Sequence, residues 1–134
     1  MKIRMTLANF FANQPTMVEY LKSKLHRAKV TAASLDYEGS ITIDAALMAE
    51  VGFSQYEKVL VANLANGNRF ETYIISGRAG SGEIILNGAT AHLGRPGDLL
   101  TIMSFVHLTA EQALKHEPRM VTLDAQNRPL SKNA

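Results

Sequence analysis

Residues 36–44 read Asp-Tyr-Glu-Gly-Ser-Ile-Thr-Ile-Asp, a stretch that passes from a turn into a strand and then into a helix. Residues 36–39 predict the turn, and residues 40–43 predict extended structure. Asp44 is suited to cap a short helix over residues 45–51, which Gly52 would end. The junction of Gly39 and Ser40 thus places a serine hydroxyl where the turn enters the strand.

The strand-and-turn pattern continues on both sides of this stretch. Asn66-Gly67 predicts a type I′ hairpin turn, because both residues tolerate a positive φ. Thr109 is expected to begin a helix, with Gln112 as its capping-box partner. Further strands are expected over residues 24–32, 58–64, 69–76, 84–86, 99–106 and 121–123, with a helical turn over residues 89–93. Short strands with few helices indicate a mainly β chain, either a small barrel or a sandwich.

Length and composition indicate one globular domain. The chain has 134 residues, of which 46% are hydrophobic and 19% charged, and these are ordinary values for a folded domain. It contains no cysteine, which excludes disulfides and thiolate metal sites and fits a reducing cytosol. We expect no membrane partner, because no apolar run approaches the roughly 20 residues that span a bilayer.

Basic residues gather in and just before the predicted strand over residues 24–32, although the net charge is only +2. They are Lys22, Lys24, Arg27 and Lys29, and they alternate with apolar residues. This pattern favours the solvated side of a strand, or a cationic pocket for a small diacid, over a nucleic-acid surface. We expect no metal site, because the histidines at positions 92, 107 and 116 lack partners at ligand spacing.

Four separated blocks of sequence, in this order, resemble the pyruvoyl-dependent aspartate α-decarboxylases. They are residues 24–31, 36–44, 66–73 and 84–92, and the likeness covers about residues 21–130. The resemblance implies a double-psi β-barrel, a homotetramer, and a cytoplasmic enzyme that converts L-aspartate to β-alanine for pantothenate and coenzyme A synthesis. Residues 21–134 would form the domain. Residues 1–20 would be an N-terminal extension, unless Met17 is the true start.

The resemblance also implies that the chain makes its own cofactor. Ser40 would attack the Gly39 carbonyl to form an ester, elimination would leave dehydroalanine, and hydrolysis would yield a pyruvoyl group at residue 40. The products would be a β chain, residues 1–39, and an α chain, residues 40–134. The substrate amine would then condense with the pyruvoyl ketone as a Schiff base, which supplies the electron sink that decarboxylation needs. Glycine at position 39 is expected to permit a strained backbone. The sequence leaves open whether maturation is spontaneous or needs an accessory protein.

Roles for side chains follow from the same resemblance. Thr72 would assist cleavage, and Tyr73 would protonate the decarboxylated intermediate. Arg69 would grip a substrate carboxylate, for which a bidentate guanidinium is suited. Further contacts in the pocket are expected from Lys24, Asn87, Gly88 and Ala89, with Tyr37 beside the cleavage site.

Two positions are less defined by the pattern. His26 alternates with Lys24 along one predicted strand, so it either faces the pocket too or is a structural histidine. Ala62 stands where family members often carry tryptophan, which puts the shape of the substrate pocket in question. Two other functions stay open: a β-barrel interaction module that has lost processing, and, more remotely, a basic nucleic-acid binder.

Overall fold

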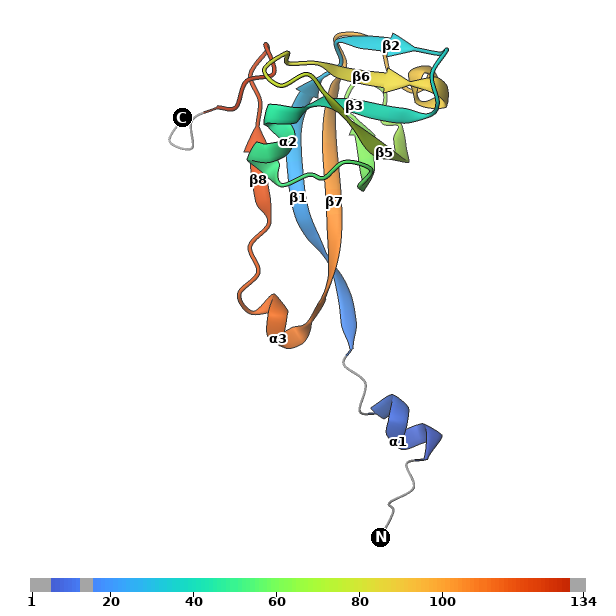
Figure 1. Cartoon of the computed structure of the whole chain (residues 1–134), viewed down its shortest axis with the longest axis vertical. Helices are drawn as coiled ribbons and strands as arrows, with labels where there is room; N and C mark the ends of the chain where they lie inside the picture. Colours follow the sequence, from blue (N-terminus) through green and yellow to red (C-terminus); the bar gives the residue numbers. More distant parts are fainter. Residues whose placement is uncertain (1–5, 13–15, 131–134) are drawn as a thin grey trace.

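The computed structural model describes residues 6–12 and 16–130. Within them, eight strands form a mixed sheet in the order β2-β6-β3-β5-β4-β7-β1-β8 (Figure 1). The strands are β1 (Met17–Lys29), β2 (Ala32–Ser34), β3 (Ser40–Asp44), β4 (Lys58–Asn63), β5 (Arg69–Gly77), β6 (Ile84–Asn87), β7 (Leu99–Thr109) and β8 (Arg119–Thr122). The helices are α1 (Leu7–Ala12), α2 (Ala45–Val51), the 3₁₀ helix η1 (Gly88–His92) and α3 (Ala110–Ala113). The predicted mainly β architecture with short helices is confirmed, and its mixed pairing is consistent with a double-psi β-barrel.

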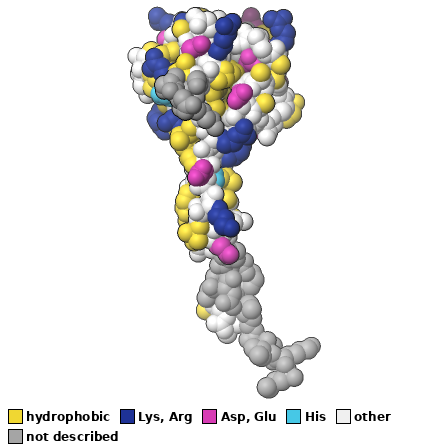
Figure 2. Space-filling model, turned by 90° about the vertical axis from the view of Figure 1, so that its left-hand side faces the viewer, with side chains coloured by type: hydrophobic (Ala, Val, Ile, Leu, Met, Phe, Trp, Pro, Cys, Tyr) yellow, Lys and Arg dark blue, Asp and Glu magenta, His cyan; other side chains and the backbone are white. Residues whose placement is uncertain are grey.

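β1 and β7 form a long antiparallel pair whose outer part extends as an arm from the rest of the sheet (Figure 1). In this arm, residues 17–21 pair with residues 105–109. Apolar side chains are exposed along this arm (Figure 2). Among the apolar residues of the arm, Met17, Val18 and Phe105 are 48%, 46% and 38% exposed. The predicted strand over residues 24–32 therefore had wrong bounds. Its partner strand, rather than its own pattern, sets where β1 begins.

The core takes buried side chains from β1, β3, β4, β5, β6, β7 and α2, and part of it lies on one face of β3, β5 and β6. Ile41, Ile43, Ile74 and Leu86 are fully buried there, and each such side chain contributes roughly 1.5–3 kcal/mol to folding. Successive residues of a strand point to opposite faces. Because Ile41 and Ile43 point into the core, Ser40 and Thr42 point to the other face of β3.

Both predicted helix caps are confirmed. Asp44 accepts a hydrogen bond from Ala46 N at 2.8 Å, and Gly52 ends α2 in the left-handed conformation with φ +80°. The Asp44 carboxylate also accepts backbone N–H groups from Gly80 at 2.9 Å and Gly82 at 2.8 Å, so it ties α2 to the loop before β6. At the other end of the sheet, the capping box between Thr109 and Gln112 starts α3.

The predicted hairpin between β4 and β5 is confirmed, but its type I′ turn is wrong. Of the two predicted turn residues, Asn66 and Gly67, only Gly67 has a positive φ, +78°. Its N–H donates to Asn63 O at 2.9 Å, which closes a longer loop. The side chains of Asn63 and Asn66 accept from the backbone N–H groups of Ala65 and Asn68, both at 2.9 Å. Such local side-chain bonds stabilise a wider loop at the expense of a two-residue turn.

Candidate active site

Ser40 is the first residue of β3 and is only 4% exposed. Its hydroxyl donates to Glu38 O at 3.1 Å and accepts from Asn87 Nδ2 at 3.1 Å. The antiparallel register of β3 and β6 sets Ser40 directly opposite Asn87. The hydroxyl next to the Gly39 carbonyl is therefore held from two sides.

A cleft of about 570 Å³ opens over this hydroxyl. Its lining comes from one face of four neighbouring strands and from the turn over residues 36–39, which we call the cleavage turn. The lining residues are Ala32, Ser34, Tyr37, Glu38, Ser40, Thr42, Tyr73, Ile75, Ile85 and Asn87. The structure thus brings four of the predicted site residues together: Ser40, Tyr73, Asn87 and Tyr37.

Gly88 is the glycine that the cleavage turn requires. Its φ is +62°, and a Cβ there would lie 2.5 Å from Tyr37 O and 2.6 Å from Gly39 N. Gly39 itself has no positive φ, and a Cβ there would meet only Ala89 N, at 4.0 Å. Gly39 therefore does not use the left-handed backbone that glycine favours, and a strained peptide at this position stays a prediction. The steric demand lies at Gly88, which presses against the turn.

Two threonines that the sequence did not single out complete the surroundings of Ser40. Thr42 accepts a hydrogen bond from Asn87 Nδ2 at 2.9 Å. Thr90, which is 6% exposed, places its hydroxyl 2.8 Å from Asn87 O and 3.2 Å from Ser40 O. Thr42 follows Ser40 by two in one strand, so alternation could have found it. No local pattern marks Thr90.

A second cluster, made of Lys24, His26 and Arg69, lies on another part of the sheet. The cross-strand register sets Arg69 opposite Ala62, Ala62 opposite Thr101, and Thr101 opposite His26. Residues directly opposite share a face, and Lys24 is two residues before His26 on the same strand. Three predicted pocket residues therefore share one face, with the small side chain of Ala62 between them.

His26 is held in this cluster by a hydrogen bond between its Nδ1 and Thr101 Oγ1, 3.0 Å apart. Partial burial lowers the pKa of His26, and the positive charges of Lys24 and Arg27 lower it further. These effects favour the neutral imidazole near neutral pH.

The second cluster and Ser40 stay apart within one chain. β5, β4 and β7 separate β3 from β1, which carries Lys24 and His26. Arg69 begins β5, the strand next to β3, but like the other two it does not line the Ser40 cleft. Thr72 directly precedes Tyr73 in β5 but does not line the Ser40 cleft. It lines a smaller pocket of about 260 Å³ with Lys58, Glu71 and Tyr73. One chain alone therefore does not assemble all the predicted residues.

Of the four basic strand residues, Lys22 has an acidic partner within the chain. Lys22 Nζ lies 2.6 Å from Glu57 Oε2 and donates to Gly52 O at 2.8 Å. This pairing of Lys22 leaves less positive charge for a nucleic acid than the sequence suggests.

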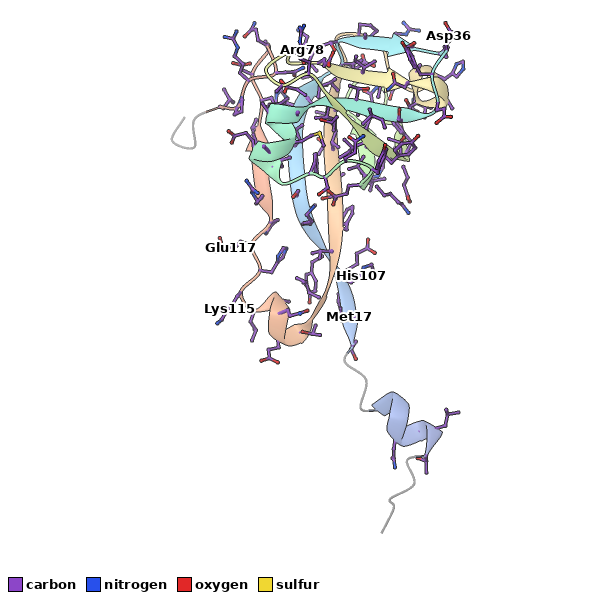
Figure 3. All side chains as sticks on the ribbon, viewed as in Figure 1. Met17, Asp36, Arg78, His107, Lys115 and Glu117 are labelled. Atoms are coloured by element: carbon purple, nitrogen blue, oxygen red, sulfur yellow. The ribbon has the colours of Figure 1, made fainter. Side chains whose placement is uncertain are left out.

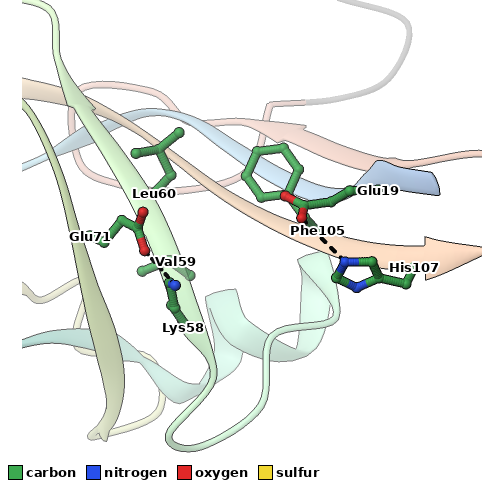
Figure 4. A pocket seen from close by; sticks show the side chains of 7 residues that line it. All are labelled: Glu19, Lys58, Val59, Leu60, Glu71, Phe105 and His107. Atoms are coloured by element: carbon green, nitrogen blue, oxygen red, sulfur yellow. Dashed lines mark ion pairs between the residues drawn. The ribbon is translucent and has the colours of Figure 1, made fainter. Parts of the chain in front are cut away.

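A groove of about 390 Å³ lies beside the arm (Figure 4). Lys58 and Glu71 form an ion pair of 2.6 Å on one side, and His107 Nε2 lies 3.4 Å from Glu19 on the other. Figure 3 shows His107 on the arm, far from Asp36, which begins the cleavage turn. No predicted site residue lines this groove.

Residues 6–12 and 16–130 contain neither a metal-binding cluster nor a membrane-spanning helix. No group of three or more His, Asp or Glu side chains there could hold a metal ion. No helix in that part of the chain is long and apolar enough to cross a membrane.

Comparison with known proteins identifies the family. The model of the family described as aspartate decarboxylase matches residues 16–130, which include the Ser40 cleft and the second cluster. The chain belongs to the aspartate decarboxylase family. The part of the chain that matches the family model begins at residue 16, one residue before β1.

Several aspartate decarboxylases are similar over most of their length. The aspartate 1-decarboxylase of Caldicellulosiruptor bescii is 53% identical over 111 residues, 83% of this chain and 87% of the relative. The aspartate 1-decarboxylase of Syntrophobacter fumaroxidans is 50% identical over 111 residues, 83% of this chain and 90% of the relative. That of Corynebacterium efficiens is 54% identical over 108 residues, 81% and 79% of the two chains.

Proposed function

We propose that this protein decarboxylates L-aspartate to β-alanine and carbon dioxide with a pyruvoyl group made from its own Ser40. The observation that carries the proposal is the buried Ser40 hydroxyl, held by Asn87 next to Gly39 in a member of the aspartate decarboxylase family. A module that had lost processing would have no need to keep these contacts, so the enzyme is the better account.

Maturation begins with the Ser40 hydroxyl. Its oxygen forms a bond to the Gly39 carbonyl carbon, the peptide C–N bond breaks, and the hydroxyl proton passes to the Ser40 nitrogen. Asn87 Nδ2 occupies one lone pair of the oxygen and fixes its direction. Gly88 confines the cleavage turn from the other side. Elimination then removes the Ser40 Cα proton and breaks the Cβ–Oγ bond of the ester, which separates residues 1–39, ending in a carboxylate, from residues 40–134. Hydrolysis of the dehydroalanine at position 40 releases ammonia and leaves the pyruvoyl group.

The surroundings of Ser40 fit a pyruvoyl group at that position. The cleft gives open space beside it, Asn87 offers an amide donor, and the bare backbone of Gly88 closes the near side. Once formed, the group supplies an electron sink for the pair that the departing carbon dioxide leaves behind.

The remaining roles fall to side chains in the two clusters. Tyr73 lines the same cleft as Ser40, from where its hydroxyl would deliver a proton to the substrate α-carbon. Arg69 binds a substrate carboxylate in bidentate fashion, and Lys24 adds a second positive charge. The neutral imidazole of His26 stands beside Lys24 as a hydrogen-bonding group.

A homo-oligomer would bring the two clusters together. Because Lys24, His26 and Arg69 do not line the Ser40 cleft of their own chain, we infer that they complete the cleft of a neighbouring chain in a homotetramer. The exposed apolar side chains of the arm, among them Met17 and Phe105, are suited to burial against another chain. A cytoplasmic location stays a prediction, and both spontaneous and assisted maturation stay open.

Product formation tests this function. Purified protein is incubated with L-aspartate, and β-alanine is measured by chromatography, with folded Ser40→Ala as the control. We expect β-alanine from the wild-type chain only. Fully cleaved wild-type protein that forms none would contradict the proposed reaction, and equal turnover by Ser40→Ala would contradict the role of Ser40.

A further inference from the structure

Thr90 carries a hydroxyl that reaches the main-chain carbonyl of Ser40. Its Oγ1 lies 2.8 Å from Asn87 O and 3.2 Å from Ser40 O, and the side chain is 6% exposed. A threonine hydroxyl has one proton to donate, so these two carbonyl oxygens compete for it. In the unreacted chain the shorter contact favours Asn87.

We propose that Thr90 stabilises the enolate that forms at residue 40 during the elimination step of maturation. This inference rests on the proposed self-processing and concerns the step after the ester has formed. The Ser40 Cα proton passes to water, and its electron pair spreads onto the Ser40 carbonyl oxygen. That pair then forms the Cα–Cβ double bond while the Cβ–Oγ bond breaks, and Gly39 leaves as a carboxylate.

The geometry favours Thr90 when this charge develops. A hydrogen bond to an ionised acceptor is roughly twice as strong as one to a neutral acceptor. Negative charge on Ser40 O therefore draws the Thr90 proton away from the neutral carbonyl of Asn87. Because the contact strengthens only as the enolate forms, it lowers the barrier without stabilising the starting ester equally. Burial of Thr90 excludes the water that would weaken it.

Asn87 and Thr90 serve different oxygens of Ser40. Asn87 Nδ2 contacts Oγ, which attacks in the first step, whereas Thr90 contacts the carbonyl oxygen, which takes up charge in the second. A purely structural Thr90 would only close the first turn of η1 through its contact with Asn87 O. Loss of that closure would lower stability but would not separate ester formation from elimination.

Three variants test the inference. Thr90→Val removes the hydroxyl and keeps the shape, and Thr90→Ser keeps a hydroxyl. Thr31→Val is the matched control. Like Thr90, Thr31 donates its hydroxyl to a backbone carbonyl of β6, Ile84 O at 3.1 Å, but it makes no hydrogen bond with residue 40. Circular dichroism checks that each variant folds. If Thr90→Val does not fold, Thr90→Ala against Thr90→Ser gives the same contrast.

The readout is the fate of freshly purified precursor over time, measured by denaturing mass spectrometry with and without hydroxylamine. The ester has the same mass as the precursor, but hydroxylamine cleaves it and releases residues 40–134 with an unmodified serine at their start. In Thr90→Val we expect this ester to accumulate and elimination to slow by about 10–1,000-fold. Thr90→Ser should recover most of the rate, and Thr31→Val should match the wild type.

The outcomes separate this inference from the proposed function. A Thr90→Val chain that matures at the wild-type rate without hydroxylamine-sensitive ester would overturn the role of Thr90 alone. A slower first step with no ester would equally contradict it, since it would place the defect before elimination. A wild-type chain that never cleaves would overturn the proposed function and this inference with it.

Discussion

At the scale of single residues, the contacts around residue 40 orient the Ser40 hydroxyl for the proposed reaction. The Ser40 hydroxyl has a hydrogen-bond donor and an acceptor within 3.1 Å. The backbone of Gly88 packs directly against the neighbouring turn, whereas the space beside Gly39 is open. A buried polar group held on both sides has few orientations, so the hydroxyl is directed before any reaction occurs. Small changes at neighbouring positions should therefore alter maturation more than they alter folding.

Gly88→Ala should slow cleavage at Ser40 strongly. The left-handed φ of +62° disfavours any side chain, and the new Cβ would fall 2.5 Å from Tyr37 O, so the cleavage turn must move. Such backbone strain costs about 1–3 kcal/mol. Gly97→Ala is the control, because Gly97 has φ +96° but nothing within 4 Å of its added Cβ. Time courses of cleavage on denaturing gels should show a defect in Gly88→Ala only; equal rates would contradict the steric role.

Tyr73→Phe should mature normally and lose turnover by about 10²–10⁴-fold, because the proton donor in the Ser40 cleft is removed. The matched control is Tyr56→Phe, since the Tyr56 ring lies 6.4 Å from the Tyr73 ring but is 69% exposed. Steady-state kcat, measured on fully cleaved protein, reports the effect. Normal turnover by Tyr73→Phe would assign the proton to another group.

At the scale of elements, local signals were predicted well and non-local ones were not. The caps of α2 and α3 depend on side chains within a few residues, so Asp44 and Gln112 could be assigned from the sequence. The start of β1 depends on pairing with β7, some 90 residues away, and no local pattern shows it. The contact of Thr90 with Ser40 spans 50 positions and was missed for the same reason.

The candidate site also has residues that the sequence predicted and a packing requirement that only the structure shows. Blocks of sequence identified Ser40, Tyr73 and Asn87, and the structure places all three around one cleft. The requirement for glycine was assigned to position 39 because the bond to be cut lies there. The structure adds a steric requirement at Gly88, whose close approach depends on how β6 and η1 pack on the cleavage turn.

Asp44 gives α2 and the loop before β6 a stability that depends on pH. Burial raises the pKa of its carboxyl, but N–H donors from Gly82, Ala46 and Gly80 outweigh burial and hold that pKa below its usual value. A lowered folded-state pKa adds stability above the unfolded pKa, and this stability is lost as pH falls through the folded pKa. Asp44→Asn should lower the free energy of unfolding by about 1 kcal/mol at pH 7, because the three N–H donors then meet a neutral acceptor in place of a charged one.

Urea unfolding of both chains at pH 7 and at pH 3 measures this effect. The difference between the wild type and Asp44→Asn should shrink at the lower pH, because Asp44 of the unfolded chain takes up a proton below its usual pKa and this offsets part of the advantage of the folded carboxylate. A difference that is the same at both pH values would show that Asp44 acts through shape rather than charge.

At the scale of the whole molecule, the two clusters predict active sites shared between chains. Ser40→Ala and Arg69→Ala should each be nearly inactive alone, yet their co-expressed mixture should regain activity. In a random one-to-one mixture, about a quarter of sites pair an intact Ser40 with an intact Arg69 from the neighbour. The β-alanine formed per milligram of mixed protein measures the recovery.

A second mixture is the control. Ser40 and Tyr73 line one cleft of a single chain, so Ser40→Ala mixed with Tyr73→Phe should stay inactive. Recovery in neither mixture would place the complete site within one chain and contradict the shared arrangement.

Denaturing mass spectrometry of the purified wild-type chain tests the central claim most directly. The account predicts two polypeptides, one ending at Gly39 and one beginning at residue 40 with a pyruvoyl group in place of serine. An active preparation that contains only the intact chain, with serine at position 40, would contradict it.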